Sequence, residues 1–247
     1  MNTTDSPGWK WNEKRDVYEG LPDRDKKWPI SVDELFEWLL ASDSQLRMQQ
    51  HLNRYFESYK GRYFEILRAQ SSQRRFEIFD VSAAETLSVT VPPRAVNRLL
   101  DKDKTRDDLL DEAFDSLTPG RDALWTCELE LLKGDRKGLG ASGPLFHLYY
   151  LLREYGIGPV TTSKLLAAKF PNVVPIRDSK VSALLGLKPT EDWWLAIRHL
   201  LEVDGGRVVS TLGDLEIARN QSETTIVRRL DIILWMEANA REISLRR

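Results

Sequence analysis

Two glycines separated by one apolar residue, with an aspartate at a fixed distance behind them, are the residues of this chain best suited to chemistry. Gly156, Ile157 and Gly158 lie between two segments with helical spacing of apolar residues, and Asp178 follows Gly156 by 22 positions. Glycine adopts backbone angles closed to other residues, so the pair predicts a sharp reversal with Ile157 plugged between two helices. The first amides of the second helix would then point outward and, with the helix dipole, hold a phosphate group.

The residues after the turn extend this predicted phosphate site. Val160 and Thr161 lie at the start of the second helix, and we predict that they bind the phosphate together with the residues of the turn. Lys164 lies one turn further along, where we expect its side chain to contact the same or an adjacent phosphate. Arg177 is predicted either to reach phosphate or to form a salt bridge with its neighbour Asp178.

Basic residues are concentrated around this stretch although the whole chain carries a net charge of −2. Residues 131–188 hold nine basic and three acidic residues, whereas residues 101–130 hold four basic and ten acidic ones. Arg136 and Lys137 lie in a glycine-rich basic loop that lacks the order of a P-loop. The asymmetry indicates a surface that faces a polyanion, unless the charges interleave on the folded surface.

Aromatic residues on the first helix of the pair are candidates for a pocket. His147, Tyr149 and Tyr150 are close enough in sequence to line a site that stacks on a base. The alternative is core packing, which is the commoner role of tyrosines at helical spacing. Core packing is also our prediction for four tryptophans, Trp125, Trp193, Trp194 and Trp235.

Composition argues against several classes of protein. With Cys127 as the single cysteine, the chain can form neither an internal disulfide nor a cysteine-based metal site or iron–sulfur cluster. The three histidines match no zinc spacing, so we expect no metal and no cofactor. No apolar run approaches the roughly 18 residues that a membrane span needs, and the polar N-terminus lacks a secretion signal. We therefore expect a cytosolic protein without a membrane partner.

Almost every periodic segment has the helical period, which predicts an all-α fold. We divide the chain into an N-terminal arm (1–30), an N-terminal helical region (31–130) and a module with the turn and the C-terminal helices (131–247). Helices are predicted from Ser31, across 42–70 with a break at Gly61, after the Pro92–Pro93 pair, and over 101–117 and 123–134. The only strand-like runs are 74–81 and 86–93, and Asp80 is predicted to cap a helix that follows it.

Residues 145–181, LFHLYYLLREYGIGPVTTSKLLAAKFPNVVPIRDSKV, resemble the helix-hairpin-helix of the HhH-GPD DNA glycosylase superfamily. Members of that family carry a catalytic aspartate 22 positions after the first hairpin glycine, behind an apolar stretch like VVPI here. The resemblance implies helical lobes around the motif and DNA as the partner, held by its backbone phosphates. It also implies that Asp178 hydrolyses a base–sugar bond after the nucleotide has rotated out of the stack.

Three features narrow or qualify this implication. Family members that also cut the backbone have a lysine two residues after the second hairpin glycine, where this chain has Val160, so a monofunctional glycosylase is favoured. Wider similarity, in NRYFESYKGRYFE, VTVPPRAVNRLL and LDIILWM, is to a bacterial family of unknown function and brings no activity. Asp178 also fits the N-cap of the next helix. The alternatives are a non-catalytic helix-hairpin-helix DNA-binding protein and a protein-interaction domain, whose protein partners the sequence does not name.

Overall fold

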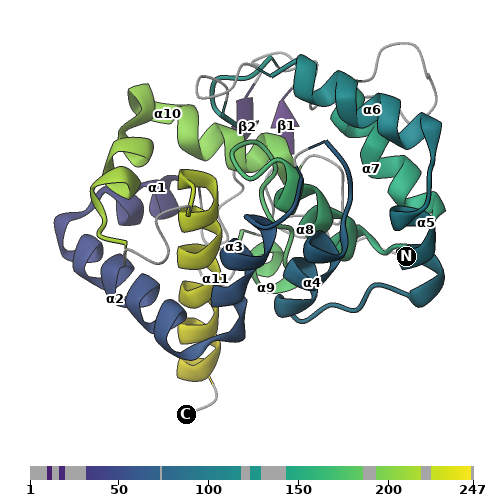
Figure 1. The fold of residues 1–247 in the computed structure, drawn as a ribbon. Coiled ribbons are helices and arrows are strands. Elements are labelled where there is room, and N and C mark those ends of the chain that lie inside the picture. The colour runs from purple at the N-terminus through teal and green to yellow at the C-terminus, as the bar shows by residue number, and fades with distance from the viewer. Residues whose placement is uncertain are drawn as a thin grey trace, which may run out of the picture. The chain divides into compact units, whose positions relative to one another are not determined.

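A computed structural model gives the fold of the chain. It describes residues 10–12, 17–19, 32–72, 74–117, 123–128, 143–185, 193–217 and 224–245 (Figure 1). In this part of the chain the structure is all-α apart from one short β-hairpin, as predicted. No helix among these residues is long and apolar enough to cross a membrane.

The chain divides into two compact units that are discontinuous in sequence. Unit 1 comprises residues 1–54, 177–216 and 229–247, and unit 2 comprises residues 55–176 and 217–228. These boundaries differ from the predicted divisions after residues 30 and 130, because segments distant in sequence pack into the same unit.

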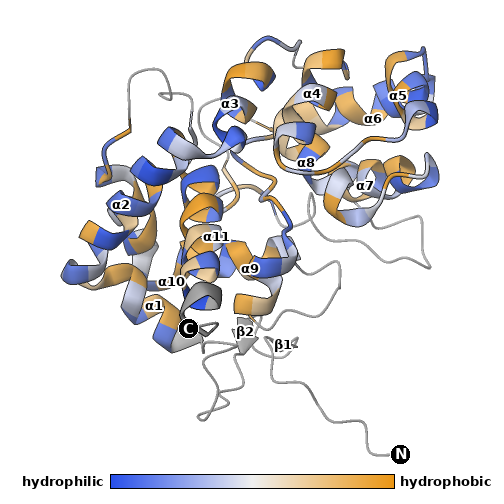
Figure 2. Cartoon of the chain, turned by 90° about the horizontal axis from the view of Figure 1, so that it is seen from below, coloured by the Kyte–Doolittle hydropathy of each residue, from blue (hydrophilic) through white to orange (hydrophobic). Residues whose placement is uncertain are grey.

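The helices of unit 1 include the longest ones that the structure describes. They are α1 (Val32–Leu40), the first part of α2 (Ser42–Ser58), α9 (Ser179–Leu184), α10 (Trp193–Asp214) and most of α11 (Ile226–Leu245). The strands β1 (Lys10–Asn12) and β2 (Val17–Glu19) pair antiparallel, with Trp11 opposite Tyr18. Hydrophobic and hydrophilic residues share the surfaces of α1 and α2, as expected for helices with one buried side (Figure 2).

Apolar packing and one buried carboxylate hold unit 1 together. Trp193 and Trp194 are 4% and 5% exposed, which confirms their predicted core role, while Trp235 is half-buried. Glu237 of α11 is buried and accepts from Arg47 and His51 of α2 at 2.8 and 3.0 Å. Burial alone would raise the pKa of Glu237. Hydrogen bonds from His51 and Arg241 and the positive charge of Arg47 nevertheless hold that pKa below its usual value.

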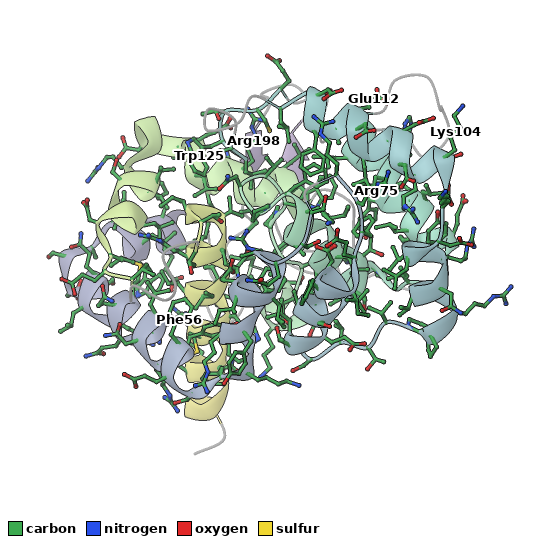
Figure 3. All side chains as sticks on the ribbon, in the orientation of Figure 1. Phe56, Arg75, Lys104, Glu112, Trp125 and Arg198 are labelled. Atoms are coloured by element: carbon green, nitrogen blue, oxygen red, sulfur yellow. The ribbon has the colours of Figure 1, made fainter. Side chains whose placement is uncertain are left out.

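Helix α10 contains a break. Val203 to Gly206 leave the helical conformation, and Asp204, Gly205 and Gly206 have positive φ. The first helical piece of α10 therefore ends before Val203, and a second helical piece follows the two glycines. Arg198, labelled in Figure 3, belongs to the first piece and forms an ion pair of 2.7 Å with Glu202.

The helices that lie wholly in unit 2 have 3 to 12 residues. They are the 3-10 helix η1 (Lys60–Arg62), α3 (Tyr63–Arg68), α4 (Ile78–Thr86), α5 (Pro93–Leu100), α6 (Lys104–Asp115), α7 (Pro144–Glu154) and α8 (Pro159–Lys169). Helix α8 packs against α3, α4 and α7 and is buried from Thr162 to Lys169. By contrast, α6 keeps an exposed side, from which Lys104 and Glu112 project (Figure 3).

Gly61 interrupts the helical stretch as predicted, because η1 separates α2 from α3. A Cβ atom at this position would clash with the hydroxyl of Tyr55 and approach its Cζ to 2.9 Å. Tyr55 is 5% exposed, and its hydroxyl accepts from Arg228 at 2.7 Å. Glycine is thus required here by a close approach to a fixed side chain.

Three local predictions are wrong. Residues 74–81 and 86–93 form no strand in their described part, since α4 begins at Ile78. Asp80 is not the N-cap of that helix: Glu77 is, and Asp80 completes a capping box from the third helical position. Residues 123–128 form a turn where a helix was predicted, with Trp125 half-buried (Figure 3).

Candidate nucleic-acid interface

The predicted reversal is present between α7 and α8. Tyr155 ends α7, Gly156 has φ +84°, and Gly158 precedes α8 with φ −66° and ψ 158°. Ile157 is 2% exposed, whereas the glycines on either side are exposed. A Cβ atom on either glycine would meet no atom of the described residues within 4 Å. The turn is therefore open to the approach of a ligand, and Ile157 is buried as predicted.

The start of α8 presents backbone amides at this open turn. The first intrahelical bond runs from Thr162 N to Gly158 O at 2.9 Å, so the amides of Val160 and Thr161 precede the hydrogen-bonded ladder. Val160 and Thr161 are half-buried, and Pro159 carries no amide hydrogen. This arrangement can accept an anion at the positive end of an 11-residue helix.

Contacts from α5 and α6 fix the base of the turn within unit 2. The hydroxyl of Tyr155 donates a hydrogen bond to Asp103, and the guanidinium of Arg98 lies 3.9 Å from the centre of the tyrosine ring. Asp103 also caps α6 by accepting from Arg106 N at 3.1 Å. The hydrogen bond from Tyr155 lowers the pKa of Asp103, and burial raises the pKa of Tyr155 well above its usual range.

A cavity of about 910 Å³ lies beside the turn in unit 2. It is lined by residues of α6 and α7 together with the turn itself, including Phe146, His147, Tyr150, Gly156, Ile157 and Gly158. The rings of Phe146 and Tyr150 are 4.8 Å apart, and Nε2 of His147 is buried without a hydrogen-bond partner among the described residues. Two of the three predicted pocket residues are thus brought to one cavity.

Tyr149, the third predicted pocket residue, does not line this cavity. Its side chain is 6% exposed, and its ring meets Tyr150 edge-on with centroids 5.5 Å apart. Tyr149 is therefore a core residue, which was the alternative to a role in the pocket.

Lys164 requires a correction. It is 3% exposed, and its Nζ donates to the carbonyl oxygen of Leu87 at 2.8 Å. Helix α8 is covered by its neighbours, so this side chain lies in the interior of unit 2 and does not reach an exposed phosphate.

Lys169, at the end of α8, is also turned inward. Its Nζ forms an ion pair of 2.7 Å with Asp80 and hydrogen bonds with Ser71 and the carbonyl of Ser72. Burial raises the pKa of Asp80 and lowers that of Lys169, because it disfavours both charged forms. The sequence did not predict this cluster, because nothing in it indicates that residues 71, 80 and 169 lie together in the fold.

These two lysines reduce the charge asymmetry seen in the sequence. Both belong to the nine basic residues of 131–188, and one of them is neutralised by Asp80. Arg136 and Lys137 lie outside the described residues. The surface around the turn is therefore less basic than the linear count indicates.

Asp178 belongs to unit 1 and caps α9, as predicted. Its Oδ1 accepts from the backbone amide of Lys180 at 2.8 Å, and its side chain is half-buried, like that of Arg177. The Nζ of Lys180 binds the side chain of Asn239. The described residues that line the cavity in unit 2 do not include Asp178. The structure thus places the turn and the aspartate in separate units.

The described part of the chain holds no group of three metal-ligating side chains. Apart from the short β-hairpin, this part of the chain is all-α, with an exposed glycine turn between α7 and α8. Residues 48–238 match the family described as "Family of unknown function (DUF6308)", and the chain belongs to this family. The match includes both the hairpin turn and Asp178. No curated protein and no solved structure matches the chain.

Proposed function

We propose that this protein is a DNA glycosylase-like enzyme. It binds the DNA backbone at the hairpin and hydrolyses the N-glycosidic bond of a modified or damaged base, without lyase activity. The observation that carries the proposal is the open turn. Gly156 and Gly158 are exposed with free space at both Cβ positions, directly before the amide end of α8.

The turn suits a phosphate for a physical reason. Backbone amides can donate to a phosphate oxygen only where no side chain keeps the strand at a distance, and the two glycines satisfy this condition. Such contacts position a strand but do not read its sequence. Hairpin binding therefore supports a protein that acts on DNA of many sequences.

Asp178 supplies the reaction in this proposal. Its Oδ1 is fixed by the amide of Lys180, and among the described residues its Oδ2 has no hydrogen-bond partner. The C1′–N bond breaks and the base leaves with the electron pair. The carboxylate stabilises the positive sugar and takes a proton from the water whose oxygen bonds to C1′. The departing base takes up a proton from the surrounding water, and the carboxylate then releases its own proton to water. Val160, at the position of the lyase lysine, favours water over an amine as the nucleophile.

A non-catalytic DNA-binding protein is the second candidate. The position of Asp178 favours this candidate. The N-cap role alone accounts for that position, and Asp178 is not among the described residues that line the cavity. This candidate keeps the hairpin contact and has no reaction.

Base release distinguishes the two candidates. Labelled duplexes that each carry a different modified base are incubated with the protein, and abasic sites are detected by alkaline strand cleavage. Asp178→Asn keeps an N-cap of equal quality, so it should fold normally and release no base. The control is Asp43→Asn, which changes an exposed carboxylate of α2 and should leave release unchanged. Release that persists in Asp178→Asn would exclude this aspartate as the catalytic residue.

DNA binding is tested separately by fluorescence anisotropy with an undamaged duplex. Gly158→Asp introduces a negative charge at the open turn, and we expect Kd to rise at least about tenfold because like charges repel across an interface. Leu46→Asp adds the same charge at a side chain that is 66% exposed in unit 1, and it should change Kd little. Binding without base release selects the second candidate. If the wild type does not bind, both candidates fail and a protein-interaction role remains.

A further inference from the structure

Another cavity of unit 2, which we call the Asp80 cavity, lies where α3, α4 and α8 pack against one another. Its volume is about 310 Å³, at the lower end of the range of roughly 300–1,000 Å³ that small-molecule sites occupy. The described lining is mainly polar and includes Arg68, Ser71, Ser72, Asp80 and Lys169. Because Ala69 and Ser72 also line it and are exposed, a small molecule can enter from the solvent.

One carboxylate oxygen of Asp80 is left without a partner. Its Oδ2 accepts from the hydroxyl of Ser71 at 2.8 Å, from the backbone amide of Glu77 at 2.7 Å and from Nζ of Lys169 at 2.7 Å. Its Oδ1 is buried and has no hydrogen-bond partner among the described residues. A buried polar atom in this state is unusual in a native structure. Since Asp80 lines the cavity, a donor for Oδ1 can lie there.

The neighbouring side chains cannot supply this donor. The ammonium of Lys169 has three protons, and its contacts with Oδ2 of Asp80, Oγ of Ser71 and the carbonyl of Ser72 use all three. The single hydroxyl proton of Ser71 is directed to Oδ2 of Asp80. A molecule in the cavity is therefore the natural source of a hydrogen bond to Oδ1.

The charges around the cavity restrict the kind of molecule. Lys169 already neutralises Asp80, and Glu65 forms an ion pair of 2.5 Å with Arg68. A cationic ligand would be repelled by Lys169 and Arg68, and an anionic one by Asp80. A neutral molecule with an N–H donor avoids both repulsions. Arg68 and Ser72 also carry side-chain donors, with which an acceptor of the same molecule can pair.

We propose that the Asp80 cavity binds the carboxamide group of a small neutral molecule, with the amide N–H donating to Oδ1 of Asp80 and the amide carbonyl accepting from the Arg68 and Ser72 side. A carboxamide places a donor and an acceptor in one small planar group, which matches this lining. Water is the competing occupant, because it also donates to a buried carboxylate. The inference depends neither on the hairpin nor on Asp178.

The test uses probes of nearly equal shape: acetamide, acetone, acetate and acetamidinium. Each is titrated into isotopically labelled wild-type protein, and the carboxyl-carbon signal of Asp80 and the amide signals of Ala69 and Ser72 are followed by NMR. We expect acetamide to shift these signals in a saturable way. Acetone keeps the carbonyl without the N–H, so it should bind at least about tenfold more weakly. The anion and the cation should also bind more weakly than acetamide.

A matched pair of variants locates the binding. Ala69 has right-handed helical backbone angles, so a leucine fits its backbone and narrows the entrance of the cavity. Ala69→Leu should weaken acetamide binding several-fold and keep the thermal unfolding midpoint near its wild-type value. Gln70→Leu adds the same side chain at the next position, which is exposed and outside the described lining, and it should leave binding unchanged.

Several results would overturn the proposal. Equal binding of acetamide and acetone would show that no ligand donor reaches Asp80. Acetamidinium or acetate bound as tightly as acetamide would refute the preference for a neutral ligand. Equal effects of Ala69→Leu and Gln70→Leu would place the binding elsewhere, and signals that no probe shifts would leave water as the occupant. Each of these failures leaves the proposed contact with DNA unaffected, because that contact is tested with duplexes at the hairpin.

Discussion

The backbone of the hairpin turn predicts opposite tolerance to alanine at its two glycines. Gly156 has φ +84°, in the left-handed region, whereas Gly158 has φ −66°, which any residue adopts. Since a Cβ atom on either glycine meets none of the described residues within 4 Å, steric contact does not distinguish the positions. Backbone strain at Gly156 and the N-cap role of Gly158 do.

The size of the difference follows from known backbone costs. Alanine in the left-handed region costs about 1–2 kcal/mol in the folded state. Because alanine also restricts the unfolded chain, about 0.4–1 kcal/mol of this cost is offset, so Gly156→Ala should lower the free energy of unfolding by about 1 kcal/mol. At Gly158 the stabilisation from restricting the unfolded chain is cancelled because alanine is a poorer N-cap than glycine. The free energy of unfolding of Gly158→Ala should therefore stay near its wild-type value. With a urea slope of about 1–3 kcal/mol per molar, Gly156→Ala should lower the midpoint by about 0.3–1 M.

Urea unfolding followed by tryptophan fluorescence measures both variants. Gly156→Asn should recover part of the loss, because asparagine tolerates left-handed angles better than alanine does. Gly205→Ala is a second control, since Gly205 also has positive φ and open space around its Cβ position. Equal midpoints for Gly156→Ala and Gly158→Ala would refute the reasoning, because the turn would then not hold Gly156 in the left-handed conformation.

Three further predictions concern the interior of unit 2. Asp80→Asn should cost about 3–5 kcal/mol in thermal unfolding because it leaves Lys169 buried without its counter-ion, and the double variant Asp80→Leu/Lys169→Met should recover most of that loss; no recovery would contradict the pairing. Gly61→Ala should cost about 1–3 kcal/mol by overpacking the interior, measured in the same way, and a neutral effect would contradict the close approach. Tyr155→Phe should cost about 1 kcal/mol at neutral pH by removing the hydrogen bond to Asp103. Because that bond lowers the pKa of Asp103, its contribution is present above the ordinary value of 3.8 and is lost as the pH falls through the lower folded pKa, so urea midpoints of wild type and variant should converge in acid.

The hairpin was predictable because its determinants are local. Two glycines, the apolar residue between them and the helical period on both sides fall within one short stretch, and the structure confirms the reversal and the burial of Ile157. The N-cap role of Asp178 is local in the same sense, since it depends on one amide two residues away. The spacing of residues close in sequence was therefore enough to predict both the hairpin turn and the N-cap of α9.

The roles of the side chains on α8 were not predictable from the same stretch. Lys164 lies one turn after the hairpin, where a lysine normally projects into solvent, but α3, α4 and α7 cover this helix. Whether a helix is covered on one side or on all sides depends on elements elsewhere in the chain. The capping of α4 shows a related limit. Glu77 and Asp80 can each cap a helix, and only the packing of the preceding residues decides where it begins.

The burial of Lys164 also predicts how the proposed binding of DNA should respond to salt. A cation that neutralises a phosphate contributes about −0.9 to the slope of log K against log salt, whereas a neutral amide releases no counter-ion. Since Nζ of Lys164 is bound to the carbonyl of Leu87 inside unit 2, Lys164→Met should lower stability and leave the salt slope of duplex binding unchanged. Anisotropy titrations at several salt concentrations, on protein shown to be folded, measure the slope. A slope that becomes less steep by about 0.9 would show that this lysine reaches a phosphate after all. An unchanged slope would show that Lys164 neutralises no phosphate, as expected if the proposed contact with DNA uses the backbone amides of the hairpin.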